Sequence, residues 1–249
     1  MDSPVVLITG GSRGIGAATA LAAARAGYAV ALSFQTDDQA AQSVVRAIEV
    51  LGGQALAIQA DVAQEDSVLS MFAAVDAAWG RLDALVNNAG VVDVASRVDA
   101  MSVARLRRMF DTTVLGSFLC AREAVLRMST RHGGRGGSIV NVSSAAARLG
   151  SPGQYVDYAA SKGAIDTFTV GLSKEVAAEG IRVNAVRPGI IDTEIHASGG
   201  EPDRARLLGA QVPMQRPGSA DEVAQAIVWL LGPHASYTTG TLLDVSGGR

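Results

Sequence analysis

The sequence predicts an α/β fold in which helices cover both faces of a doubly wound parallel sheet of seven strands. Short β-branched runs alternate with longer stretches of helical spacing along the chain. A loop rich in glycine follows the first of these runs, and neither a linker nor a repeat divides the 249 residues. We therefore expect residues 1–249 to form a single domain.

The expected strands and helices alternate from the N-terminus onward. Strands are predicted at residues 5–9, 29–34, 54–59, 84–87, 138–142, 182–187 and 241–245. Helices are predicted over residues 13–26, 37–51, 67–79, 102–130, 155–179 and 221–231. This order is typical of parallel strands joined by crossover helices.

Residues 188–217 are the one irregular tract. Glycine and proline interrupt it, and it contains only a short helix candidate at residues 203–209. Such a tract is typical of a binding loop or lid, although a plain surface excursion has the same composition. We expect residues 188–217 to form a substrate-binding loop within the domain.

The composition argues against several classes of protein. The net charge is −3 and basic residues occur only in isolated spots, so no nucleic-acid footprint stands out. The single cysteine, Cys120, excludes an intramolecular disulfide and fits a reducing compartment, and three scattered histidines have no metal-ligand spacing. The N-terminus resembles neither a signal peptide nor a membrane span. We expect a cytoplasmic protein that binds no metal, membrane or nucleic acid.

The stretch VLITGGSRGIGAATALA combines an apolar strand, a loop with several glycines and an alanine-rich helix. Glycines at positions 10, 14 and 16 permit a tight turn and let backbone N–H groups at the helix start approach a phosphate. The spacing TGxxxGxG differs from the GxGxxG of many dehydrogenases. A glycine loop alone is often only a turn, but this one lies between the first strand and the first helix, where such sheets bind dinucleotides.

Five motifs together resemble the short-chain dehydrogenase/reductase superfamily. They are TGGSRGIG at 9–16, NNAG at 87–90, YAASK at 158–162, Pro188 and Gly189 with Thr193, and the C-terminal pair TG at 239–240 with DVSGG at 244–248. The resemblance covers essentially the whole chain and implies a Rossmann-type, NAD(P)-dependent oxidoreductase. The segment ARLGSPGQYVDYAASKGA most resembles the branch described as glucose- or ribitol-dehydrogenase-like.

The resemblance also implies which residues bind the cofactor. The pyrophosphate and adenosine would be bound by Gly10, Ser12, Arg13, Gly14, Ile15 and Gly16. The adenine would be flanked by Asp61 and Val62. The nicotinamide side would be bound by Asn88, Ala89, Gly90, Tyr158, Lys162, Pro188, Gly189, Ile191 and Thr193. Two structural alternatives stay open. Asp61 could be a plain helix-capping acid, and residues 87–88 a turn that stabilises a strand.

The choice between NADP and NAD depends on the end of the second strand, where an acid would bond the ribose 2′-hydroxyl and repel a 2′-phosphate. No acid occurs at residues 33–34, and Asp37 and Asp38 are better interpreted as the N-terminal cap of the next helix. Arg13 has the chemistry to pair with a 2′-phosphate. We expect NADP, with NAD as the alternative.

Tyr158 and Lys162 are i, i+4 neighbours on one face of a predicted helix, about 6 Å apart along its axis, whereas Tyr155 and Lys162 are about 10.5 Å apart. A nearby ammonium acts to lower the pKa of a tyrosine from its ordinary value of about 10. The resemblance likewise gives Tyr158 the acid/base role and Lys162 the nicotinamide ribose. It assigns the hydroxyl that holds the substrate oxygen to Ser144, which leaves Ser143 as a strand-end cap. Tyr155 is expected to be a wall of the pocket.

One residue departs from the family pattern. The family usually has asparagine at the position of Thr113, where it helps hold a helix distortion. We expect the Thr113 hydroxyl to bond backbone in its place and activity to survive.

The reaction implied by the resemblance is reversible hydride transfer between NADP(H) and a small carbonyl or alcohol substrate in a homotetramer. Three alternatives stay open: an NAD-dependent sugar or polyol dehydrogenase, an isomerase, dehydratase or epimerase, and a dinucleotide-binding regulator whose catalysis is weakened at Thr113.

Overall fold

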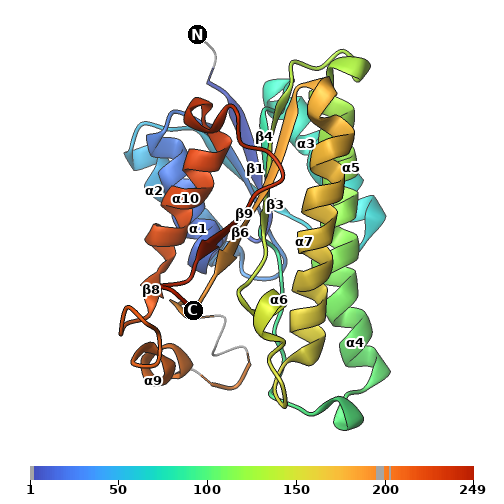
Figure 1. Cartoon of the computed structure of the whole chain (residues 1–249). Helices are drawn as coiled ribbons and strands as arrows, with labels where there is room; N and C mark the ends of the chain where they lie inside the picture. The colour runs from blue at the N-terminus through green and yellow to red at the C-terminus, as the bar shows by residue number, and fades with distance from the viewer. Residues whose placement is uncertain (1–2, 195–198, 202) are drawn as a thin grey trace.

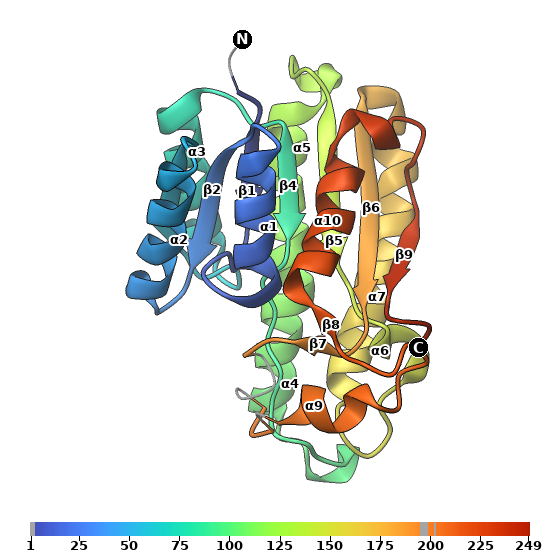
Figure 2. The same cartoon turned by 90° about the vertical axis from the view of Figure 1, so that its left-hand side faces the viewer.

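The central sheet contains seven parallel strands in the order β3-β2-β1-β4-β5-β6-β9 (Figure 2). The computed structural model describes residues 3–194, 199–201 and 203–249. The strands are β1 Val5–Ile8, β2 Ala29–Phe34, β3 Ala55–Gln59, β4 Ala84–Asn87, β5 Gly137–Val142, β6 Ile181–Pro188 and β9 Leu242–Val245. The predicted doubly wound sheet of seven strands is confirmed.

Helices cover both faces of the sheet (Figure 1). One face carries α1 Gly14–Arg25, α2 Asp38–Val50 and α10 Ala220–Leu231; the other carries α3 Glu65–Trp79, α5 Gly116–Met128 and α7 Val156–Val176. Side chains alternate along a strand, so Val6 and Ile8 join the core on the first face while Val5 and Leu7 join the core on the second. This burial on both sides explains why the strands are continuous apolar runs.

The strand order reverses between β1 and β4. The chain moves outward from β1 to β3 and then returns to pair β4 with the free side of β1, from which it continues to β9. At such a switch point the loops after the two strands diverge and leave a crevice at their carboxyl ends. The glycine loop after β1 and the NNAG segment after β4 therefore lie opposite each other.

The predicted helix over residues 102–130 is not continuous. The structure divides it into α4 Val103–Phe110, a π-helical segment Asp111–Leu115 and α5, and the N–H of Gly116 donates to the carbonyl of Asp111. A π turn inserts one extra residue and displaces the neighbouring backbone. The displacement suits Gly116, because a Cβ there would lie 2.8 Å from Val62 Cγ2.

The remaining elements are short helices, two-residue strands and single helical turns. They are α6 Ala146–Leu149, β7 Ile191–Asp192, β8 Gly218–Ser219, α9 Arg204–Gly209, and single turns at Val98–Ala100, Thr130–His132, Ala177–Glu179 and Pro233–Ala235. The short helix expected at 203–209 is thus present as α9. Figure 2 shows α9 and the β7–β8 pair beyond the carboxyl ends of the sheet. None of the helices in the described ranges has the length and hydropathy of a membrane span.

Candidate active site

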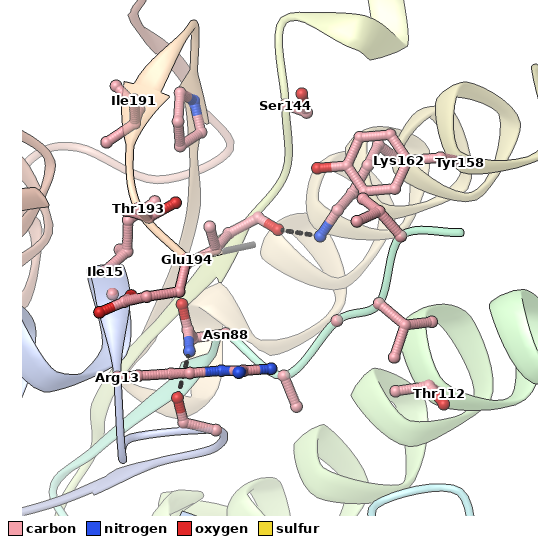
Figure 3. Close-up of a pocket in the computed structure, with 18 of the residues that line it drawn as sticks. Arg13, Ile15, Asn88, Thr112, Ser144, Tyr158, Lys162, Ile191, Thr193 and Glu194 are labelled. Carbon is pink, nitrogen blue, oxygen red and sulfur yellow. Dashed lines mark hydrogen bonds between the residues drawn. The ribbon is translucent and has the colours of Figure 1, made fainter. Parts of the chain in front are cut away.

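A cavity of about 460 Å³ opens at the carboxyl ends of β1, β4 and β5 (Figure 3). It brings together nearly every residue that the sequence singled out: Gly10, Ser12, Arg13, Gly14, Ile15, Asp61, Val62, Asn88, Ala89, Gly90, Ser144, Tyr158, Lys162, Pro188, Gly189, Ile191 and Thr193. Gly16 is the exception, because it lies behind the loop rather than on the cavity wall. Among the residues with described positions, no three His, Cys, Asp or Glu side chains gather as a metal site.

The glycine loop is held in a narrow turn by its neighbours. Gly10 adopts φ +63°, and a Cβ at Gly16 would lie only 2.2 Å from the carbonyl oxygen of Gly10. The side chain of Asn88 donates to the carbonyls of Thr9 and Gly10 at 2.8 and 2.9 Å. Asn88 therefore fixes the loop in addition to lining the cavity, and glycine at 16 is required by packing.

The N-terminus of α1 faces this cavity, and its N-cap residue does not cap it with a side chain. Arg13 is the N-cap residue and makes no side-chain cap bond, and no acidic residue occupies the first turn. The N–H groups of a first helical turn have no partner within the helix, and the helix dipole favours an anion there. These donors and the glycine backbone fit a pyrophosphate group.

The part of the cavity that is expected to bind adenosine has a different polar lining. Ser33 is buried at the end of β2 and accepts a hydrogen bond from Gly10 N, while Asp37 caps α2 by accepting from Ala40 N at 2.9 Å. The capping role predicted for Asp37 is confirmed. Asp61 accepts from Ala63 N at 3.0 Å, whereas the N-cap of α3 is Gln64. The alternative that Asp61 is a plain helix cap is therefore wrong.

Tyr158 and Lys162 lie one turn apart on α7 and both face the cavity (Figure 3). The ammonium of Lys162 is 5.7 Å from the centroid of the Tyr158 ring and donates to the carbonyl of Val142 at 2.6 Å. This bond ties the lysine to the end of β5. A Cβ at Gly90 would lie 3.5 Å from Lys162 Nζ, which is an ordinary contact distance and places Gly90 beside the ammonium.

Burial dominates the electrostatics of this pair in the protein alone. Burial raises the pKa of Tyr158, and its hydrogen bond with Ser144 acts in the opposite direction. Burial lowers the pKa of Lys162 to about 8, while the Asp166 carboxylate acts to raise it. In the protein without a cofactor, burial outweighs the lowering of the Tyr158 pKa that was expected from Lys162. Burial therefore favours the protonated form of Tyr158.

The two serines after β5 have separate roles. Ser144 lies at the cavity and accepts from Ala146 N at 3.1 Å. Ser143 donates to the carboxylate of Asp166 at 2.7 Å and contacts the carbonyl of Lys162 at 3.2 Å. Ser143 therefore joins β5 to α7 and is more than the strand-end cap that was predicted, whereas the Ser144 hydroxyl is next to Tyr158.

Thr113 lies in the π-helical segment and is buried. The carbonyl of Thr113 accepts from the Ser117 hydroxyl at 2.7 Å, but its own hydroxyl has no hydrogen-bond partner in the described part of the chain. The expectation that this hydroxyl bonds backbone is wrong.

Three groups near the site were missed or only partly anticipated. Arg105 of α4 forms a buried ion pair with Asp157, and their separation of 52 residues leaves no local signal in the sequence. Asp166 pairs with Arg187 of β6; its position four residues after Lys162 is the signal that could have found it. Tyr155 lines the cavity as expected, and its hydroxyl donates to Glu201 at 3.2 Å.

Comparison with known proteins gives matches over nearly the full length. The family model described as Enoyl-(Acyl carrier protein) reductase matches residues 10–249. The uncharacterized oxidoreductase YgfF of Escherichia coli is 58% identical over 245 residues, which is 98% of this chain and 99% of the relative. The 3beta-hydroxysteroid dehydrogenase 1 of Eggerthella lenta is 38% identical over 249 residues, 100% of this chain and 94% of its own. A solved short chain dehydrogenase from Burkholderia cenocepacia, in complex with NADP, is 35% identical with a TM-score of 0.90 and coverage of 98% and 97%.

Proposed function

The chain belongs to the short-chain dehydrogenase/reductase family and is an NAD(P)-dependent oxidoreductase, and from this premise we propose that it transfers hydride reversibly between NADP(H) and a carbonyl or alcohol carbon of a small substrate. The observation that carries the proposal is the convergence of Ser144, Tyr158 and Lys162 on the cavity that the glycine loop also lines. A proton donor, a second hydroxyl and a cation at one point suit a developing alkoxide.

The cavity residues fit the dinucleotide that this chemistry needs. The backbone of the glycine loop and the start of α1 would hold the pyrophosphate, and Asp61 and Val62 would flank the adenine. Asn88, Ala89, Gly90, Lys162 and the segment 188–193 would surround the nicotinamide and its ribose. When bound, the nicotinamide supplies or accepts the hydride.

The protein's part in the reaction is to orient the substrate oxygen and to move one proton. In the reductive direction Ser144 and Tyr158 hydrogen-bond the carbonyl oxygen, and Tyr158 gives its proton to that oxygen as negative charge develops. The buried ammonium of Lys162 stabilises the phenolate left on Tyr158. In the oxidative direction the same groups act in reverse, and Tyr158 takes the proton of the alcohol.

A preference for NADP is supported by the groups around the adenosine side. Arg13 and the neutral Gln35 line the cavity there, and the carboxylate of Asp37 is engaged in capping α2. An arginine pairs with a phosphate through charge-assisted hydrogen bonds, whereas a carboxylate that faced the 2′-phosphate directly would repel it. The relative from Burkholderia cenocepacia has NADP bound.

An assay with a panel of ketones, diketones, quinones and sugars tests the proposal. Loss of the absorbance of the reduced nicotinamide measures the reduction of each compound. NADPH and NADH are supplied separately, and consumption of NADPH with formation of the matching alcohol is expected. Cofactor binding without turnover on a broad panel would point instead to a regulator. Product formed without net cofactor oxidation would point to an isomerase.

The assembly is proposed to be a homotetramer. Apolar side chains remain exposed along α4, the π-helical segment and α5: Val103, Phe110, Leu115, Phe118 and Leu126. An apolar helix face of this kind suits burial against a second copy of the chain. Light scattering coupled to size-exclusion chromatography measures the mass directly, and a monomer of 25.5 kDa would contradict the proposal.

A further inference from the structure

Side chains of alternating charge lead from the catalytic lysine to the C-terminus. Lys162 is followed one helical turn later by Asp166, whose carboxylate binds Arg187 of β6 at 2.7 Å. Arg187 also approaches Asp244 of β9 at 4.0 Å, and Asp244 pairs with Arg148 of α6 at 3.3 Å. The exposed fraction of the side chains rises along this series, from 11% at Asp166 to 46% at Arg148.

Resting on the function proposed above, we propose that Asp166 and Arg187 are positioning residues of the active site that act in opposite directions on the charge of Lys162. Asp166 stabilises the Lys162 ammonium, and Arg187 limits that stabilisation by neutralising part of the Asp166 charge. Neither residue contacts the cavity, so both act through Lys162.

The geometry holds the Asp166 carboxylate in one orientation behind the lysine. Its Oδ1 accepts from the Ser143 hydroxyl at 2.7 Å, and its Oδ2 accepts from Arg187 Nε and Nη2 at 3.0 and 2.7 Å. The i, i+4 spacing on α7 places the residue about 6 Å from Lys162 along the helix axis. As whole residues, Lys162 and Asp166 are 4% and 8% exposed, and charges interact more strongly where water is excluded.

Within the described ranges, Asp166 is the acidic group that acts on the charge of Lys162. Tyr158 precedes Lys162 on α7 and is held protonated by burial. Asp157 lies further back on the same helix, where the guanidinium of Arg105 from α4 neutralises it. From the sheet, β5 offers only the carbonyl of Val142, and β6 contributes Arg187 behind Asp166.

The two substitutions that separate this proposal from simple damage are Asp166→Asn and Arg187→Gln. Loss of the carboxylate leaves Lys162 without this counter-charge while Arg187 keeps its positive charge, so the pKa of Lys162 falls further below its folded value of about 8. Loss of the guanidinium frees the full negative charge of Asp166, so the pKa of Lys162 rises. Damage to packing alone would not move the two variants in opposite directions.

The composition of the chain makes the titration of Lys162 directly measurable. Lys162 and Lys174 are the only lysines among 249 residues, and Lys174 is exposed on α7. In a Lys174→Arg background, protein grown with lysine labelled with 13C at the ε carbon therefore gives one lysine ε signal. Its chemical shift against pH reports the protonation of Lys162 in the cofactor-free protein.

We expect Asp166→Asn to lower the titration midpoint by about one pH unit or more and Arg187→Gln to raise it. Asp76→Asn is the control, because it is the same change at another arginine-paired carboxylate, on α3, and its midpoint should stay near that of the background protein. The proposal is overturned if both variants move the midpoint in the same direction, or if Asp166→Asn moves it no further than the control. If Asp166→Asn does not fold, Arg187→Gln decides: a midpoint that is unchanged or lowered overturns the proposal.

Turnover gives an independent readout. Loss of the Lys162 charge at alkaline pH removes its support for the Tyr158 phenolate, so the alkaline limit of activity should move down with Asp166→Asn and up with Arg187→Gln. The titration needs neither cofactor nor substrate. A failed search for a substrate therefore contradicts the proposed function while leaving the electrostatic result intact, and an unchanged titration in an active enzyme contradicts only the inference.

Discussion

Arg105 binds Asp157 through two hydrogen bonds, Nε to Oδ2 at 2.7 Å and Nη2 to Oδ1 at 3.1 Å, one residue before Tyr158. The third nitrogen, Nη1, donates to the carbonyl of Val94 at 2.5 Å. One guanidinium thus joins α4, the first turn of α7 and the loop that follows β4. Because both side chains are buried, the pair fixes the backbone from which Tyr158, the proposed proton donor, extends.

Substitution of Arg105 by glutamine should lower the free energy of unfolding by about 3 to 5 kcal/mol, because it leaves the Asp157 carboxylate buried without its partner. Urea denaturation measures the loss. Arg97→Gln, which breaks the exposed pair with Asp99, is the control and should have little effect. A double replacement by Met at 105 and Leu at 157 should recover most of the stability. If Arg105→Gln is as stable as Arg97→Gln, the pair has no structural role.

Tyr158→Phe should reduce turnover by about a hundredfold or more while cofactor binding is retained, because only the proton donor is lost. Tyr155→Phe keeps the ring in the cavity wall but removes the hydroxyl that donates to Glu201. It should change KM among substrates with less effect on kcat. Steady-state kinetics of the two variants separate the roles, and the reverse pattern would transfer catalysis to Tyr155.

Substitutions at Thr113 test whether the chain is a competent enzyme or one with weakened catalysis. Its buried hydroxyl has no partner among the described residues, so Thr113→Val should raise the free energy of unfolding by about 1 kcal/mol through removal of an unpaired polar group. Thr113→Asn, which restores the usual family residue, should change kcat by less than about tenfold. A gain of several orders of magnitude in kcat would identify the natural chain as a regulator with lapsed catalysis.

Much of this fold could be predicted because the controlling patterns are local. Apolar runs, helical spacing and glycine positions placed all seven strands of the main sheet, and the five motifs placed the lining of the cavity. The resemblance implied a helix distortion at Thr113, but the π-helical segment Asp111–Leu115 was not predicted as an element, because its residues have ordinary helical spacing.

The ion pairs around the site could not be predicted from local sequence patterns. Arg105 and Asp157 are far apart in the sequence and meet only in the folded chain. Arg187 binds Asp166 of α7 from strand β6. The raised pKa of Tyr158 in the protein alone could not be predicted for the same reason: helical spacing gives the distance to Lys162, but burial and the direction of the ammonium are tertiary properties.

Arg13 provides the test of cofactor choice. Arg13→Gln should weaken NADPH binding by about ten- to a hundredfold and NADH binding little, because only NADPH has a phosphate for the guanidinium to pair with. Quenching of protein fluorescence measures both affinities without turnover. Arg25→Gln, at the other end of α1, is the matched control and should leave both unchanged. Equal weakening of the two cofactors by Arg13→Gln would show that this residue does not read the 2′-phosphate.

Lys162→Met should make the protein more stable at pH 7 while abolishing turnover. Burial lowers the pKa of Lys162 from 10.5 to about 8, so the folded state binds this proton more weakly than the unfolded state does. Stability of the natural chain therefore rises between about pH 8 and 10.5, where unfolding takes up a proton, and below pH 8 the full cost of the buried charge is present. That cost is of the order of 3 kcal/mol. Urea denaturation of both proteins from pH 6.5 to 9.5 should show the advantage of Lys162→Met shrinking as pH rises; a constant difference would mean that the Lys162 pKa is the same in the folded and unfolded states.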